Sequence, residues 1–136
     1  MNKVWIAMVL SSVASLSHAT QQAFLIQNSG WMEPFYQDQN SQFKPLINGV
    51  IQTVAKPDDK IVVSVFNQSN ALAKSPKIIY QGAGAKPMLA DLQAQQIAYK
   101  NDKAYADTDF TEAVVSTITE PFAKQSGIIW IFTNNK

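Results

Sequence analysis

Three short apolar runs, each bounded by polar residues, predict the strands of a central sheet. They cover residues 23–26, 61–66 and 128–132 and are rich in β-branched and aromatic side chains. None alternates between apolar and polar residues, which is typical of strands buried on both faces in a parallel sheet. A fourth run at 77–81 follows the second after only about ten residues, which favours an antiparallel hairpin over a helical crossover.

Apolar residues at helical spacing predict the helices between these strands. The first helix carries its apolar face from Phe43 to Val54 and should begin near Lys44, since Pro45 fits only in the first turn. A second helix is predicted from Pro87. A third opens with the capping-box pattern 109–112 and runs to about Thr119, before Pro121. The apolar side of the second helix would be formed by Met88, Leu89, Leu92 and Ile97.

The order of these elements predicts one α/β domain over residues 20–136, with a Rossmann-like, three-layer arrangement. Its sheet should be mainly parallel, with one antiparallel edge strand. Segments 33–40 and 101–108 are expected to be polar loops, the former broken by Pro34. The first strand ends in a polar, glycine-containing turn, and ligands of open α/β sheets bind at this carboxyl edge.

The last strand, 128–132, is too apolar for the edge of a sheet, so it should have a neighbour on each side. The sequence ends four residues after it. Either a partner completes the sheet, or the chain lacks a C-terminal segment of the same gene product. We favour the second explanation, so the domain is expected to be incomplete at its C-terminus.

The first nineteen residues resemble a secretory signal peptide. Lys3 supplies a positive start, 4–10 is almost wholly apolar, and 17–19 places small residues around His18. Serines interrupt the apolar run well short of the roughly 20 residues that a membrane span needs. We therefore predict cleavage after Ala19 and a periplasmic or secreted bacterial protein, with no membrane span once the leader is removed.

Charge and residue content narrow the chemistry of the mature chain. Loss of Lys3 leaves ten of the eleven lysines against ten acidic residues, and arginine and cysteine are absent. No basic stripe suits nucleic acid or an anionic membrane. The only histidine, His18, leaves with the leader, so a Ser-His triad, a Cys nucleophile and a usual zinc site are all excluded. Asp58 and Asp59 fall in a turn opposite the ligand edge and are expected to be solvated. We predict that the protein is not an enzyme.

Four segments then occur in an order and spacing that a known family shares. They are 27–32 (QNSGWM), 57–66 (PDDKIVVSVF), 107–114 (DTDFTEAV) and 131–135 (IFTNN). Together they resemble the N-terminal portion of a von Willebrand factor type A (vWA) domain. In that family the first strand ends in Asp-x-Ser-x-Ser-Met, a Pro-Gly-Asp-Arg turn precedes the second strand, a Thr-bearing loop precedes a helix, and a later strand ends in Thr-Asp-Gly.

The resemblance implies a metal-ion-dependent adhesion site, which this sequence carries in a degenerate form. Ser29 and Thr108 match two hydroxyl ligands. Gln27 and Asn134 stand where the family has aspartates, and Trp31 replaces the second serine. Neutral ligands do not offset a divalent charge, so we expect no metal or other cofactor. The alternative is a Mg²⁺ site rescued by a carboxylate beside Thr108, at Asp107 or Asp109; otherwise Asp109 caps its helix and Asp107 is a solvated loop residue.

The matched residues are also candidates for binding a protein partner. Hydrogen bonds among them could close the loops, while Trp31 could cover the former metal cavity or stay exposed as an aromatic anchor. We predict an exported protein-binding module, with a metal-dependent adhesion domain or an inert scaffold of a larger envelope protein as alternatives. The candidate binding residues are Gln27, Ser29, Trp31, Thr108, Asp109 and Asn134.

Overall fold

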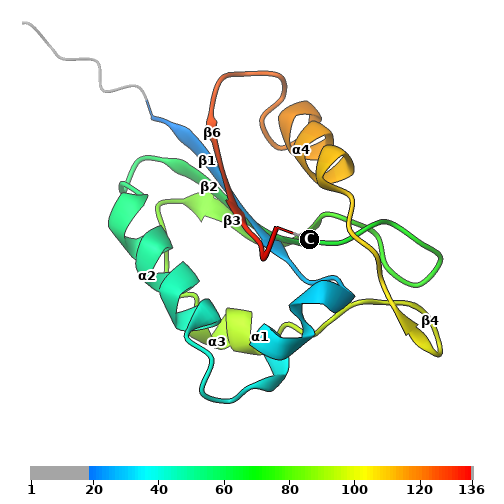
Figure 1. Cartoon of the computed structure of the whole chain (residues 1–136). Coiled ribbons are helices and arrows are strands. Elements are labelled where there is room, and N and C mark those ends of the chain that lie inside the picture. Colours follow the sequence, from blue (N-terminus) through cyan, green and yellow to red (C-terminus); the bar gives the residue numbers. More distant parts are fainter. Residues whose placement is uncertain (1–18, 136) are drawn as a thin grey trace, which may run out of the picture.

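A computed structural model describes residues 19–135 of the chain, so nearly all of the predicted signal peptide lies outside the described residues. Four strands form the central sheet (Figure 1): β1 (Gln21–Gln27), β2 (Lys60–Phe66), β3 (Lys77–Ala83) and β6 (Ile128–Phe132). Their spatial order is β3-β2-β1-β6. β1 runs parallel to β2 and β6, whereas β2 and β3 form the antiparallel hairpin. The predicted α/β class with a mainly parallel, mixed sheet is confirmed.

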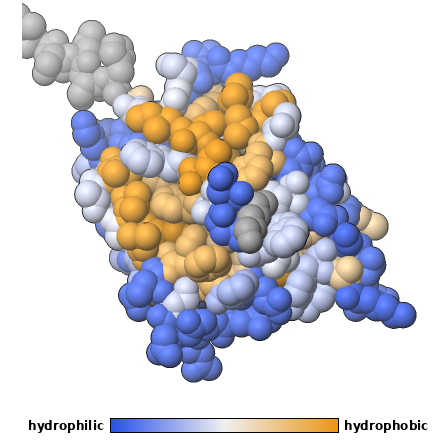
Figure 2. Space-filling view, viewed as in Figure 1, coloured by the Kyte–Doolittle hydropathy of each residue, from blue (hydrophilic) through white to orange (hydrophobic). Residues whose placement is uncertain are grey.

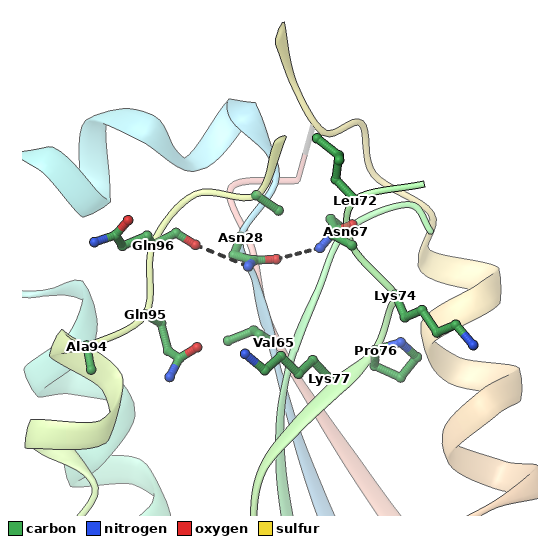
Figure 3. Close-up of a pocket in the computed structure, with 12 residues that line it drawn as sticks. Asn28, Val65, Asn67, Leu72, Lys74, Pro76, Lys77, Ala94, Gln95 and Gln96 are labelled. Carbon is green, nitrogen blue, oxygen red and sulfur yellow. Dashed lines mark hydrogen bonds between the residues drawn. The ribbon is translucent and has the colours of Figure 1, made fainter. Parts of the chain in front are cut away.

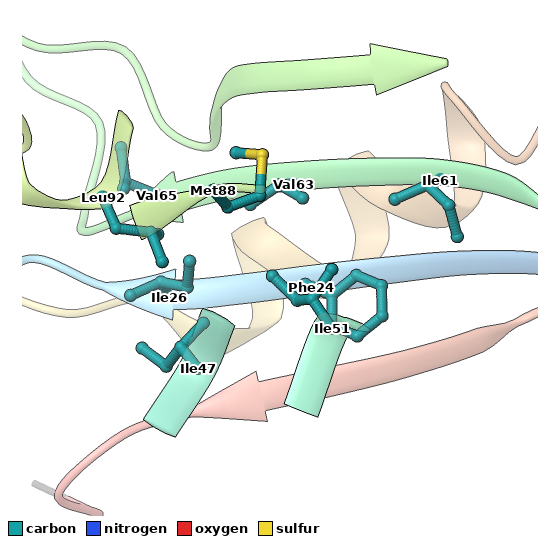
Figure 4. Packing of buried hydrophobic residues seen from close by; sticks show 9 residues of the cluster. All are labelled: Phe24, Ile26, Ile47, Ile51, Ile61, Val63, Val65, Met88 and Leu92. Carbon is teal, nitrogen blue, oxygen red and sulfur yellow. The ribbon is translucent and has the colours of Figure 1, made fainter. Parts of the chain in front are cut away.

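Helices cover both faces of this sheet. On one face, α2 (Phe43–Val54) and the short α3 (Leu89–Gln93) pack against alternate residues of β1 and β2. Figure 4 shows Ile47 and Ile51 of α2 meeting Phe24 and Ile26 of β1. On the other face, α4 (Phe110–Thr119) packs Ala113 against the intervening strand residues. Burial on both faces explains why β1 and β2 lack polar alternation.

Local sequence determines where α2 and α4 begin. Pro45 lies in the first turn of α2, where its missing N–H breaks no helical hydrogen bond. Asp109 caps α4, since its Oδ1 accepts a hydrogen bond of 2.8 Å from the backbone N–H of Glu112. The helix ends at Thr119, two residues before Pro121. Both predicted helices are therefore confirmed.

Three local predictions are wrong. The second helix is only five residues long because the chain turns towards β1, where the N–H of Ala98 donates to the carbonyl of Asn28 at 2.9 Å. Ile97 consequently lies outside it. The segment 33–40, which was predicted to be a loop broken by Pro34, contains α1 (Glu33–Gln37). Its proline lies in the first turn of the helix, where proline is tolerated. The loop at 101–108 includes part of a small hairpin of β4 (Tyr99–Asn101) and β5 (Ala104–Tyr105).

Asp59 is buried and not solvated as predicted, with 3% of its surface exposed. Its Oδ2 accepts hydrogen bonds from the Lys56 N–H and the Gln22 Nε2, each at 2.8 Å, and its Oδ1 accepts one from the Thr20 N–H at 3.1 Å. These hydrogen bonds hold the pKa of Asp59 below its usual range despite the opposing effect of burial. The bond from the Lys56 N–H has the largest effect. Asp59 thus fastens the start of β1 to the turn before β2.

β6 has one neighbouring strand, β1, within the described residues 19–135. The second neighbour that its apolar sequence predicts stays a prediction. No helix in this part of the chain has the length and apolar composition needed to cross a membrane.

Candidate binding site at the carboxyl edge of the sheet

The loops that follow β1 and β2 converge at one edge of the sheet and are tied together by backbone hydrogen bonds. The Gly30 N–H donates to the Ala106 carbonyl at 2.9 Å, and the Gln68 N–H donates to the Asp107 carbonyl at 2.7 Å. Segments that are distant in sequence are therefore held side by side where the strands end.

A buried hydrogen-bond network occupies the position matched to the family's metal site. The Nε2 of Gln27 donates to the Ser29 Oγ at 2.7 Å and to the Thr108 Oγ1 at 2.8 Å. The two hydroxyl oxygens lie 2.6 Å apart, within hydrogen-bond distance. Gln27 and Ser29 are fully buried. The structure thus brings together three of the six predicted site residues.

Two residues that the sequence analysis did not select complete this network. The hydroxyl of Thr133 bonds to the Oε1 of Gln27, and the hydroxyl of Tyr36 donates to the Gln27 backbone carbonyl at 2.9 Å. Burial raises the pKa of the Tyr36 phenol, so it remains a donor. Thr133 could have been found because it directly follows the strand that neighbours β1. Tyr36 gave no signal, because α1 was not predicted.

The carboxylates beside Thr108 are engaged elsewhere. Asp109 caps α4, and the Oδ2 of Asp107 lies 2.8 Å from the Nζ of Lys100. The network itself offers amide and hydroxyl groups without a negative charge, and the Gln27 N–H groups point at the two hydroxyl oxygens. Mg²⁺ favours sites with carboxylate ligands, so these residues do not fit it. Within residues 19–135, no group of three or more Asp, Glu, His or Cys side chains is placed to hold a metal ion.

Trp31 follows Ser29 of this network by two residues and faces solvent, with 58% of its surface exposed. Its backbone carbonyl accepts a hydrogen bond of 2.7 Å from the Nδ2 of Asn134, which ties the loop after β6 to the loop after β1. A hollow of about 590 Å³ lies beside it. The lining residues are Gly30, Trp31, Glu33, Pro34, Phe35 and Asn134.

An aromatic pair from the small hairpin supports the other side of Gly30. Tyr99 and Tyr105 lie with their ring centroids 4.8 Å apart, and the Tyr105 hydroxyl donates to the Oε1 of Glu33 at 3.1 Å. Hydrogen bonding to Tyr99 and then to Glu33 raises the pKa of Tyr105 to about 12. A Cβ added at Gly30 would lie 2.7 Å from the Tyr105 Cβ, so this close approach requires glycine.

A second, more polar hollow of about 570 Å³ opens at the end of β2. Figure 3 shows a chain of amides at its base, in which Asn67 donates to the Asn28 Oδ1 at 3.0 Å and Asn28 donates to the Gln96 carbonyl at 3.2 Å. Because a carbonyl only accepts, this chain fixes the orientation of both amides. The side chains of Gln95 and Lys77 lie over the hollow.

Comparison of the sequence with models of known protein families and with curated proteins finds no match. The proposed function therefore rests on the geometry of the site and on the sequence motifs.

Proposed function

We propose that this chain is an exported protein-binding module of the vWA kind, which binds a protein partner through the loops at the carboxyl edge of its sheet without a metal ion. The mature protein would begin at Thr20 and act in the periplasm or outside the cell, and it would have no enzymatic activity. The four family-like segments described above support the vWA assignment, since β1, β2, α4 and β6 occur where that family has the corresponding elements.

The observation that carries this proposal is the solvent exposure of Trp31 on a loop that hydrogen bonds hold in place. Large aromatic side chains that stay exposed beside a hollow are typical centres of protein interfaces, where tryptophan is enriched among the residues that dominate binding. Phe35 adds a second exposed aromatic ring, with 40% of its surface accessible, on the rim of the same hollow. The hydrogen bonds of Ser29 and Gly30 hold the loop that carries Trp31, which limits the entropy that this loop loses on binding.

A metal-independent mechanism is supported by the hydrogen bonds of Gln27. Thermal unfolding followed at increasing Mg²⁺ or Mn²⁺ concentration tests it directly. We expect the midpoint to stay constant, because an ion that binds only weakly adds little stability to the native state. A saturable rise in the midpoint would overturn the metal-free proposal and favour the metal-dependent adhesion alternative.

The role of Trp31 is tested by exchanging it for alanine. We expect Trp31→Ala to weaken recovery of a cross-linked envelope partner at least about tenfold, as for a central interface residue. Val115→Ala is the matched control, since Val115 is similarly exposed at 54% but lies within α4 and not in the loops at the carboxyl edge. Both variants should retain the circular dichroism of the wild type. Equal recovery by the two variants would remove Trp31 from the site, and loss of all specific recovery in the wild type would favour the inert scaffold.

A further inference from the structure

The polar hollow at the end of β2 contains a buried hydrogen-bond acceptor that no described residue satisfies. Asn67 lines this hollow and is only 2% exposed, and its Oδ1 has no hydrogen-bond partner within residues 19–135. Turning the amide over would not help, because its oxygen would then face the Oδ1 of Asn28, to which its nitrogen now donates. Buried polar atoms are nearly always paired, so this oxygen marks a place for a donor from outside the chain.

The loop that follows β2 fixes the position of this acceptor. The Asn67 N–H donates to the Ser75 Oγ at 2.9 Å, and the same hydroxyl donates to the Asn67 carbonyl at 2.8 Å. The Ser75 N–H in turn donates to the Ser69 Oγ at 2.9 Å, which closes the loop. A donor that binds the Oδ1 of Asn67 therefore meets an acceptor already held in place, which limits the entropy lost on binding.

The charge of the hollow is positive. Two of its lining residues are lysines, Lys74 and Lys77, and none is acidic. Neither lysine forms a salt bridge with another residue of the described part of the chain. Figure 3 shows Lys77 extending across the hollow towards Gln95, whereas Lys74 points away from it. Lys77 is therefore placed to attract an anion that enters the hollow.

The other walls and the size of the hollow suit a small ligand with an apolar part. Its volume of about 570 Å³ lies within the range of about 300–1,000 Å³ that is typical of small-ligand sites. No lining residue comes from β6 or from the loop after it, so the hollow does not belong to the hydrophobic surface around β6 that Figure 2 shows. The apolar lining residues are Val65, Leu72, Ala73, Pro76, Ala94 and Ala98.

We propose that this hollow binds a carboxylate ligand with an N–H donor beside the carboxylate, which is the chemistry of an α-amino acid or of the C-terminal residue of a peptide. The carboxylate binds the Lys77 ammonium group, the N–H donates to the Asn67 Oδ1, and an apolar side chain contacts the walls. Because the Oδ1 is buried, its bond to the ligand forms away from water and is stronger for that reason. The site shares no lining residue with the hollow beside Trp31, so it is independent of the proposed partner site.

Isothermal titration calorimetry tests the proposal on the protein purified after expression of the full chain. The two probes are leucine and the capped dipeptide N-acetyl-alanyl-leucine. We expect saturable binding with a dissociation constant of about 1 mM or below for at least one of them. Binding of leucine alone would identify a free amino acid as the ligand, and binding of the dipeptide alone would identify a peptide C-terminus.

Matched analogues separate the two polar contacts. 4-Methylpentanoate keeps the carboxylate and side chain of leucine without its amino group, and leucinamide lacks the carboxylate. For the dipeptide, the corresponding analogues carry an ester oxygen in place of the leucine N–H, or a C-terminal amide. Each analogue should bind about tenfold or more weakly than its parent probe, since each removes one of the two contacts.

Lys77→Gln should likewise weaken binding about tenfold or more. Lys60→Gln is the matched control, because Lys60 is an exposed lysine at the other end of the sheet, where β2 begins, and its replacement should leave binding unchanged. In the wild-type protein, the side-chain amide resonances of Asn67 should shift as either probe saturates the site. This nuclear magnetic resonance measurement requires no substitution, so it does not depend on the folding of a variant.

Four results would overturn the proposal. The first is the absence of saturable binding by both probes below about 10 mM. The second is equal binding by an analogue that lacks the N–H donor, since Asn67 would then not be used. The third is equal weakening by Lys60→Gln and Lys77→Gln. The fourth is tighter binding of inorganic phosphate than of either probe, which would show that the site selects a different anion.

Discussion

Replacing Asp59 by asparagine should destabilise the domain far more than the same change at the adjacent Asp58. Asp58 is exposed, whereas Asp59 is buried and accepts three hydrogen bonds of 2.8–3.1 Å. The pair therefore compares one chemical change in two environments that are one residue apart. It tests the conclusion that a carboxylate joins the start of β1 to the turn before β2.

The expected loss follows from the geometry of the three bonds. An asparagine at 59 can keep its oxygen against Gln22 and Lys56, but its NH₂ group then faces the N–H of Thr20. One bond is lost, a donor is left unpaired, and the two remaining bonds lose their charge. Together these effects should cost about 2–4 kcal/mol, since bonds to charged groups contribute about 1.5–3 kcal/mol each. Native domains are stable by only about 5–15 kcal/mol, so the loss is large.

Urea denaturation followed by circular dichroism measures this difference. The pKa of Asp59 is lowered in the folded protein, so its carboxylate contributes stability above the unfolded pKa of about 3.9, and that contribution disappears as the pH falls through the folded value. The gap between wild type and Asp59→Asn should therefore be full at pH 7 and shrink below about pH 4. A gap within about 0.5 kcal/mol of the Asp58→Asn value, or one that does not change with pH, would refute the reasoning.

Three further predictions use neighbouring contacts. Gly30→Ala should destabilise the domain by about 1–3 kcal/mol in the same assay, because the new Cβ would lie 2.7 Å from the Tyr105 Cβ. Ultraviolet titration should show one tyrosine, Tyr105, ionising near pH 12, and Glu33→Gln should lower this value, since Glu33 helps to raise it. If cleavage leaves Thr20 as the first residue, its ammonium group would lie against the Asp59 carboxylate, to which the Thr20 N–H donates at 3.1 Å. N-terminal acetylation of the mature protein should then lower its stability in the same assay, because it removes the positive charge from this contact.

The sheet, α2 and α4 could be predicted because each repeats one physical signal over many residues. Strands 61–66 and 128–132 are apolar throughout, and α2 keeps an apolar face over three turns. The short elements could not be predicted in this way. α1 contains Pro34, which breaks most helices and is tolerated only in the first turn, and α3 ends early because Asn28 binds the chain that follows it.

The burial of Asp59 was missed for a different reason. Two of its three partners, Thr20 and Gln22, are 39 and 37 residues away in the sequence. A local pattern of turn residues before a strand predicts a solvated carboxylate, and only the pairing of β1 with β2 brings the distant donors to it. Thr133 was missed similarly, because its contact with Gln27 depends on the pairing of β6 with β1.

This last contact links β6 to the loop of Trp31. β6 ends at Phe132, the next residue bonds to the side chain of Gln27, and Asn134 then bonds to the Trp31 carbonyl. The pairing of β6 with β1 positions both residues, so it also determines how the loop of Trp31 is held.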